Sequence, residues 1–109
     1  MVNNLHSESE VRRHALGRVA KLFGVDVATL LPSMRFGYEL KASCAPSLFK
    51  RNEYDFIEDD ILDACDRVMY QQMLNGGLTV YTLEDYCNLM VKGYERKPSI
   101  IAGVLELPS

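Results

Sequence analysis

The spacing of apolar residues is the feature that most constrains how this chain folds. Three stretches, residues 7–23, 55–74 and 82–94, repeat hydrophobic residues every three or four positions. This spacing is typical of amphipathic helices with one buried face, and no stretch shows the alternation of a half-exposed strand. We therefore expect residues 1–109 to form a single all-α domain, a small antiparallel helical bundle with three main helices and shorter ones.

The first and last of these stretches carry clear signals at their ends. Ser7 and Glu10 form the capping-box pattern at the start of the first helix, and Gly24 provides its stop. Thr82 and Asp85 repeat the same pattern at the start of the last main helix. These residues therefore predict helices that begin near positions 8 and 83.

The middle stretch combines an apolar stripe with many carboxylates. We expect Asp55 to cap its N-terminus and one helix to continue as far as Leu74, before Asn75-Gly76-Gly77. The apolar stripe consists of Ile61, Leu62, Cys65, Val68 and Met69. The acidic face, which we expect to point outward and to bind a partner, consists of Glu58, Asp59, Asp60, Asp63 and Asp66.

Shorter segments connect the helices. Asp26 is expected to cap one short turn before Pro32, with Val27, Leu30 and Leu31 packed beneath the first helix. Phe36 and Leu40 are expected to anchor an irregular segment, and residues 41–54 are expected to form a loop.

The segment after Pro98 is predicted to be either a short helix or an extended arm. Its hydrophobic residues need cover, either from the core of the same chain or from a second copy. The second possibility would make the protein a homodimer through its C-terminal apolar tail. These residues are Ile100, Ile101, Val104, Leu105 and Leu107.

Composition argues against two classes of partner. The formal net charge of -3 and the pI near 5.3 disfavour binding to nucleic acid. The first helix nevertheless has a basic face, so a nucleic-acid-binding regulator stays an alternative. This face consists of Arg12, Arg13, Arg18 and Lys21. The sequence has neither a membrane-spanning apolar run nor the pattern of a signal peptide. We therefore expect a cytoplasmic protein that does not bind membranes.

The residues that could support catalysis or metal binding are few. Cys44, Cys65 and Cys87 are widely spaced, and His6 and His14 are the only histidines. This spacing does not suit a zinc site, and no nucleophile is paired with a base, so we expect no metal, no catalytic residue and no enzymatic activity.

Three motifs resemble the acyl carrier protein family. They are Leu22–Pro32, the F-x-x-x-L segment Phe36–Leu40, and the T-V-x-x-L-x-x-Y segment Thr79–Tyr86. The resemblance covers roughly residues 8 to 94. It implies an antiparallel helical bundle that carries acyl groups on phosphopantetheine and meets its enzymes through an acidic second helix.

The attachment site implied by this resemblance is altered. The D-S-L signature of the family places a serine at the start of the acidic helix, where the helix N-terminus stabilises a phosphodiester. The matching position reads Asp59-Asp60-Ile61, and a carboxylate cannot form that phosphodiester. Ser43 and Ser47, in the segment before the acidic helix, are the alternative attachment residues, but neither has the flanking residues of the signature, and the 41–54 segment is longer than in the family.

These observations favour a non-enzymatic protein-interaction (adaptor) domain of acyl carrier protein-like architecture without phosphopantetheine. Its acidic helix face would meet a protein partner with a basic surface, since opposite charges speed association and select partners. The alternative is an acyl or group carrier modified with phosphopantetheine on Ser43 or Ser47.

Overall fold

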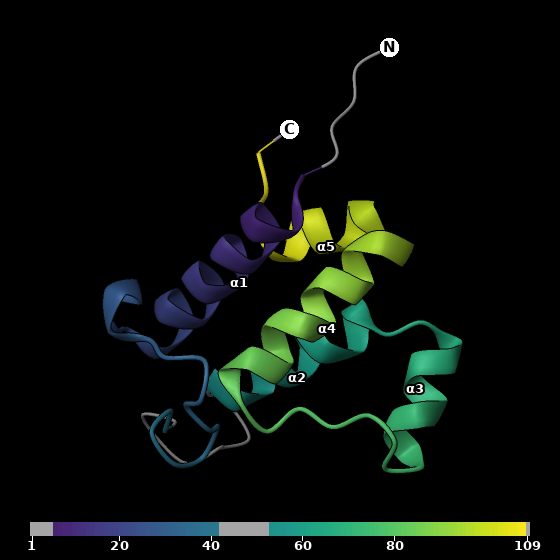
Figure 1. Ribbon diagram of the computed structural model, residues 1–109, viewed down its shortest axis with the longest axis horizontal. Coiled ribbons are helices and arrows are strands. Elements are labelled where there is room, and N and C mark those ends of the chain that lie inside the picture. Colours follow the sequence, from purple (N-terminus) through teal and green to yellow (C-terminus); the bar gives the residue numbers. More distant parts are fainter. Residues whose placement is uncertain (1–5, 42–52, 109) are drawn as a thin grey trace.

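The described part of the chain is a small all-α bundle, as the sequence predicts (Figure 1). The computed structural model describes residues 6–41 and 53–108. Within these residues the only β contacts are two isolated bridges, Arg35 with Thr82 and Phe36 with Leu40. The helical elements are α1 (Glu8–Phe23), the 3-10 turn η1 (Val27–Thr29), α2 (Glu53–Ala64), α3 (Arg67–Leu74), α4 (Leu83–Arg96) and α5 (Pro98–Val104).

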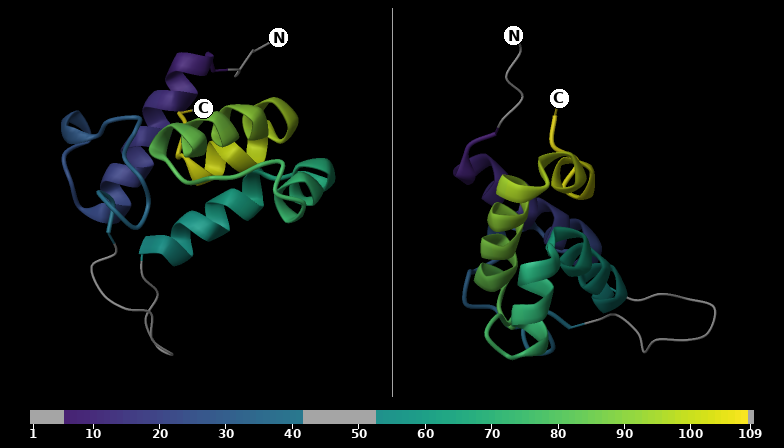
Figure 2. Two further views of the ribbon diagram at one scale, coloured as in Figure 1. Left: turned by 60° about the horizontal axis from the view of Figure 1, so that its bottom comes forward. Right: turned by 90° about the vertical axis from the view of Figure 1, so that its right-hand side faces the viewer.

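The helix α4 is the centre of the bundle. It packs against α1, α2 and α5, and it runs opposite to α1 (Figures 1 and 2). Because residues 78–82 return the chain across the molecule, α2 and α4 run in the same general direction. The core consequently lies around α4, whose residues Leu83, Tyr86 and Met90 are completely buried.

The predicted ends of the first and last main helices are confirmed. Ser7 caps α1, its hydroxyl accepts from the Glu10 N–H, and Gly24 ends the helix in the left-handed conformation at φ 68°. Thr82 and Asp85 form the same reciprocal capping box at the start of α4. These caps satisfy N–H groups that have no partner within the helix.

The prediction of one continuous middle helix is wrong. The chain breaks at Cys65 and Asp66, where the Asp66 carboxylate accepts from the Met69 N–H and caps a separate helix, α3. Asp55 lies inside α2 rather than at its N-cap. The local cap competes successfully with helix continuation because Asp is a poor interior residue and a strong N-cap.

The residues of α2 that face the core also differ from the predicted stripe. The buried face follows the helical period through Ile57, Asp60 and Ala64. Leu62 and Val68, both predicted to lie on the apolar stripe, are instead 53% and 58% exposed. The predicted stripe is therefore wrong at these two positions, whereas Cys65 and Met69 are buried and Ile61 packs against the core.

The segment that follows α1, up to Lys41, is partly as predicted. Asp26 caps η1 by accepting from the Ala28 N–H at 2.9 Å. Of the three residues expected beneath α1, only Leu30 is buried, whereas Val27 and Leu31 are exposed.

The irregular segment is anchored as expected. Leu40 is buried and Phe36 packs against the core, with its ring beside those of Phe23 and Tyr86. The Phe36 N–H donates to the Tyr81 carbonyl at 2.9 Å, which joins this segment to the return segment 78–82.

The segment after Pro98 forms α5, and its own chain covers most of its apolar side chains. Ile101, Leu105 and Leu107 are buried, while Ile100 is exposed. Gly93 of α4 allows close approach, since a Cβ there would lie 3.0 Å from the Ala64 side chain and 3.1 Å from Ile101. Packing of this tail therefore does not require a second copy.

Candidate functional site

Asp60 is buried, so the prediction that it belongs to an outward acidic face is wrong. Only 3% of its surface is exposed. Arg18 of α1 donates to it from Nε at 2.9 Å and from Nη2 at 3.1 Å, and the Tyr86 hydroxyl of α4 donates at 2.7 Å. The three side chains join α1, α2 and α4 through one buried polar cluster, which we call the Arg18–Asp60–Tyr86 cluster.

The surroundings of Arg18 and Tyr86 in this cluster favour their protonated forms. The hydrogen bond to Asp60 raises the pKa of Arg18 above its ordinary value. Burial raises the pKa of Tyr86 far above its ordinary value, and the neighbouring Asp60 carboxylate raises it further. Tyr86 therefore stays protonated and serves as a hydrogen-bond donor, and the cluster is a structural contact rather than a reactive one.

The position of Asp60 also differs from the one that the family resemblance implies. It lies well inside α2, which begins at Glu53, and not at the helix N-terminus. A group attached there would have to leave the core through the Arg18 and Tyr86 contacts.

The other predicted acidic residues divide into two sets. Glu58, Asp59 and Asp63 are exposed on α2. Asp66 is half-buried, caps α3 and forms an ion pair with Arg96. The Met69 N–H lowers the pKa of Asp66, and Arg96 adds to this effect. The structure therefore leaves Glu58, Asp59 and Asp63 as the outward acidic face.

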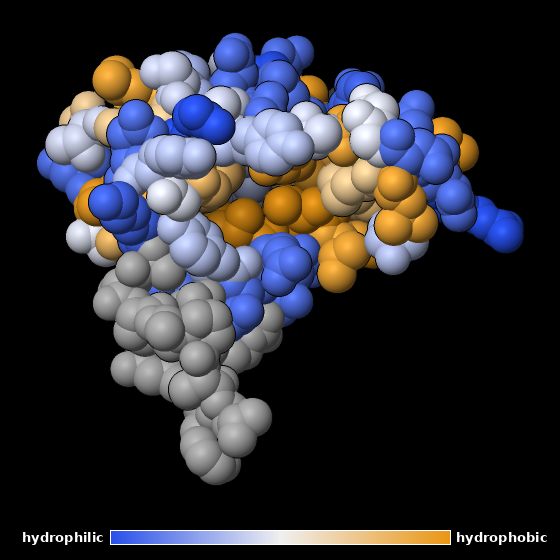
Figure 3. All heavy atoms as spheres, turned by 90° about the horizontal axis from the view of Figure 1, so that it is seen from below, coloured by the Kyte–Doolittle hydropathy of each residue, from blue (hydrophilic) through white to orange (hydrophobic). Residues whose placement is uncertain are grey.

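Exposed apolar side chains accompany these acids. Figure 3, which views the bundle from below, shows hydrophobic side chains gathered in a hollow with hydrophilic ones around it. The elements on this side include α2, α3 and the return segment 78–82 (Figure 1). We call six of their aliphatic and methionine residues the α2–α3 surface: Leu62, Val68 and Leu74, which are exposed, and Ile61, Met73 and Val80, which are half-buried. The same elements also expose the aromatic residues Phe56, Tyr70 and Tyr81.

The α2–α3 surface is a feature that the sequence alone did not reveal. The helical period assigned Leu62 to the core, although the buried face of α2 runs through Ile57, Asp60 and Ala64. It assigned Val68 to the core because it assumed one continuous helix. Recognition of Asp66 as an N-cap would have supplied the missing signal for Val68, since a break there frees the following residues from the register of α2.

The basic face of α1 is largely occupied by contacts within the chain. Arg18 points into the core toward Asp60, Arg12 pairs with Glu8, and Lys21 pairs with Glu106. Arg13 is exposed on the same helix. Most of the positive charge expected on this face is therefore neutralised locally.

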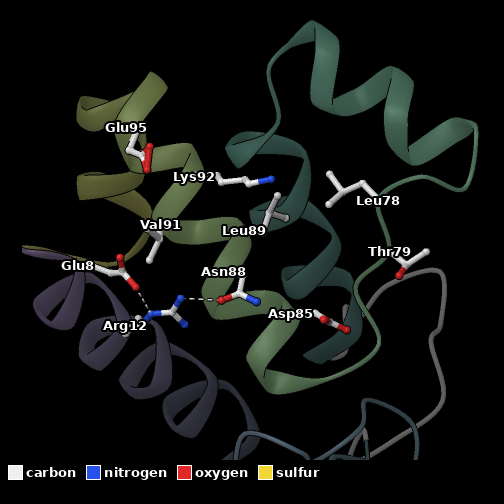
Figure 4. A pocket seen from close by; sticks show the side chains of 10 residues that line it. All are labelled: Glu8, Arg12, Leu78, Thr79, Asp85, Asn88, Leu89, Val91, Lys92 and Glu95. Atoms are coloured by element: carbon white, nitrogen blue, oxygen red, sulfur yellow. Dashed lines mark hydrogen bonds and ion pairs between the residues drawn. The ribbon is translucent and has the colours of Figure 1, made fainter.

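A pocket with a volume of about 390 Å³ lies between α1, α4 and the return segment (Figure 4). The Arg12 guanidinium lies between Glu8 and the Asn88 amide oxygen, to which it donates at 2.6 Å, and Lys92 extends from α4 across the pocket. Its lining residues are Glu8, Arg12, Leu78, Thr79, Asp85, Asn88, Leu89, Val91, Lys92 and Glu95. Because three carboxylates surround two cations, this lining selects no single class of charged ligand.

The remaining candidate residues are either outside the described ranges or buried. Ser43 and Ser47, the alternative attachment residues, lie outside the described residues, as does Cys44. Cys65 and Cys87 are buried free thiols, and burial raises the pKa of Cys87 to about 11. Neither thiol is therefore activated as a nucleophile.

The described residues offer neither a cluster of metal-binding side chains nor a membrane-spanning helix. Within residues 6–41 and 53–108, no group of three or more His, Cys, Asp or Glu side chains is arranged to hold a metal ion. Among the helices of the described ranges, none has the length and apolarity needed to span a bilayer.

Comparison with known proteins gives no relative. No protein-family model, no curated protein and no solved structure matches this chain.

Proposed function

We propose that this chain is a non-enzymatic, cytoplasmic protein-interaction domain, of acyl carrier protein-like architecture, that binds a partner with a basic surface. The observation that carries the proposal is the exposed acidic face of α2, formed by Glu58, Asp59 and Asp63 beside exposed Leu62. Acids that act only as solvating groups need no apolar neighbour, whereas protein-binding surfaces combine charge at the rim with apolar side chains.

The buried cluster supports this assignment indirectly. Asp60 is committed to Arg18 and Tyr86, so it acts as a fixed point that orients α2 against α1 and α4. The neighbouring Asp59 and Asp63 are thereby held outward on a rigid helix. A preorganised surface loses less conformational entropy on binding.

Charge-reversal tests the proposal. The variant Glu58→Lys/Asp63→Lys is used as bait in a lysate of the native host, beside the unchanged chain and the control Glu84→Lys/Glu95→Lys. The control changes the same amount of charge at two exposed positions of α4. We expect specific partners to be lost with the first variant and retained with the control, as quantified by mass spectrometry. Identical partner lists for all three baits would contradict the proposal.

The two alternatives from the sequence receive less support. Nucleic-acid binding through α1 would have to break the ion pairs of Arg12, Arg18 and Lys21. A carrier role on Ser43 or Ser47 is decided by the intact mass of the chain after coexpression with a broad phosphopantetheinyl transferase. An unmodified mass removes that role.

A further inference from the structure

We propose that the α2–α3 surface binds an amphipathic helix of the partner, with its apolar side in the hollow and its basic residues against Glu58, Asp59 and Asp63. This inference rests on the proposed function and names the shape and chemistry of the segment that is bound. Three observations lead to it: the exposure of the apolar side chains, the form of the surface, and the charge around it.

The first observation is exposure without packing inside the chain. Leu62, Val68 and Leu74 are 53%, 58% and 63% exposed. The helix α3 is anchored through buried Met69, half-buried Met73 and the ion pair of Asp66 with Arg96, and it makes no extensive contact with another helix of the described chain. Single exposed hydrophobic side chains are common, but a gathered apolar patch such as the one in Figure 3 is typical of a binding surface.

The second observation is the form of the surface. Hydrophobic side chains line a hollow on the side of the bundle that contains α2, α3 and the return segment (Figure 3). A hollow between elements suits a helix laid along it with side chains at every third or fourth position. A flat partner surface would not reach the hydrophobic side chains inside the hollow.

The third observation is charge, and it selects the occupant. Glu58, Asp59 and Asp63 lie on the same helix as Leu62. They outnumber two nearby cations, Arg67 of α3 and Lys97, whose ammonium donates to the Asp63 carbonyl at 3.0 Å. A second copy of this chain would bring its own acids to a two-fold contact, because a symmetric dimer uses the same patch on both subunits. A basic amphipathic helix instead places opposite charges together, so it is the occupant that we propose.

The test uses the full chain and three labelled peptides of equal length. The first is a helix of leucine and lysine with leucine at positions i, i+3, i+4 and i+7. The second replaces each leucine by serine, and the third replaces each lysine by glutamate. Fluorescence anisotropy measures binding at peptide concentrations where sedimentation shows each peptide to be monomeric.

We expect the leucine–lysine peptide to bind at least about tenfold more tightly than either of the others. Leu62→Ser and Leu74→Ser should each weaken its binding by about tenfold. The control Leu31→Ser, at a position 58% exposed beside η1, should leave binding unchanged. Circular dichroism of each variant confirms that the exposed substitutions leave the fold intact.

Each other outcome overturns the inference in a distinguishable way. Equal binding of the lysine–serine peptide means that charge alone suffices, so the acidic interaction face stands and the apolar hollow does not. Equal binding of the leucine–glutamate peptide removes the basic partner and the proposed function with it. A dimer that Leu62→Ser dissociates identifies a second copy as the occupant.

Discussion

Removal of the Asp60 carboxylate should destabilise the fold strongly. Asp60 is buried and accepts two hydrogen bonds from Arg18 and one from Tyr86. Asp60→Ala leaves the Tyr86 hydroxyl without its partner in the core and the Arg18 guanidinium without its counter-ion. Breaking a buried ion pair by removal of one partner costs about 3–5 kcal/mol. Since a small domain is stable by about 5–15 kcal/mol in total, the variant should remain folded but with a small margin.

The size of the effect can be checked by a graded series. Tyr86→Phe removes one hydrogen bond to a charged acceptor and keeps the ring, so it should cost about 1.5–3 kcal/mol. Glu58→Ala, an exposed acid on the same helix, should change the free energy of unfolding by less than about 0.5 kcal/mol. The expected order of stability is therefore Glu58→Ala, then Tyr86→Phe, then Asp60→Ala.

Urea denaturation followed by circular dichroism measures this series. A shift in the midpoint at constant slope reports the change in stability directly. If Asp60→Ala costs less than about 1 kcal/mol, or no more than Glu58→Ala, then the three hydrogen bonds do not stabilise the fold and our reasoning about α2 is wrong.

Three further predictions concern caps, thiols and packing. Although burial acts in the opposite direction, the N–H groups of Tyr81 and Thr82 lower the pKa of Asp85. This contribution to stability is present above about pH 4 and is lost as the pH falls through the lowered pKa. Asp85→Asn should therefore make the melting temperature fall less steeply at acid pH. An unchanged fall at acid pH would refute this prediction. Because burial raises its pKa to about 11, Cys87 should react with iodoacetamide at pH 8 more than about a hundredfold more slowly in the folded chain than in urea. Peptide mass spectrometry measures the two rates. Similar rates would show that the thiol is accessible in the folded chain. Gly93→Ala should lower the free energy of unfolding by about 1–3 kcal/mol, measured by urea denaturation, because the new Cβ meets Ala64 and Ile101. Gly103→Ala, where a Cβ has open space, should be neutral or slightly stabilising. Equal effects of the two variants would contradict the close packing of α4.

The features that the sequence predicted well are those set by neighbouring residues. Ser7 with Glu10 and Thr82 with Asp85 form their caps within three residues of each other, and the capping pattern located both helix starts. The stripe of α4 was equally clear, because its apolar period continues without interruption from Leu83 to Tyr94.

The features that the sequence did not predict depend on distant contacts. An aspartate at position 60 is favourable inside the core only because Arg18 and Tyr86, 42 and 26 residues away, meet it there. The helical period cannot reveal such partners, so Asp60 was assigned to the outer face. The same assignment error moved Leu62 and Val68 into the core, and it hid the α2–α3 surface.

Site-specific photo-crosslinking in the native host tests the interaction face most directly. A photoreactive amino acid is placed at Glu58 in one strain and at Glu95, an exposed acid of α4, in another. We predict a discrete crosslinked protein from position 58 and none from position 95. Absence of any product from position 58, or the same product from both positions, would contradict the proposal that this face of α2 binds a partner.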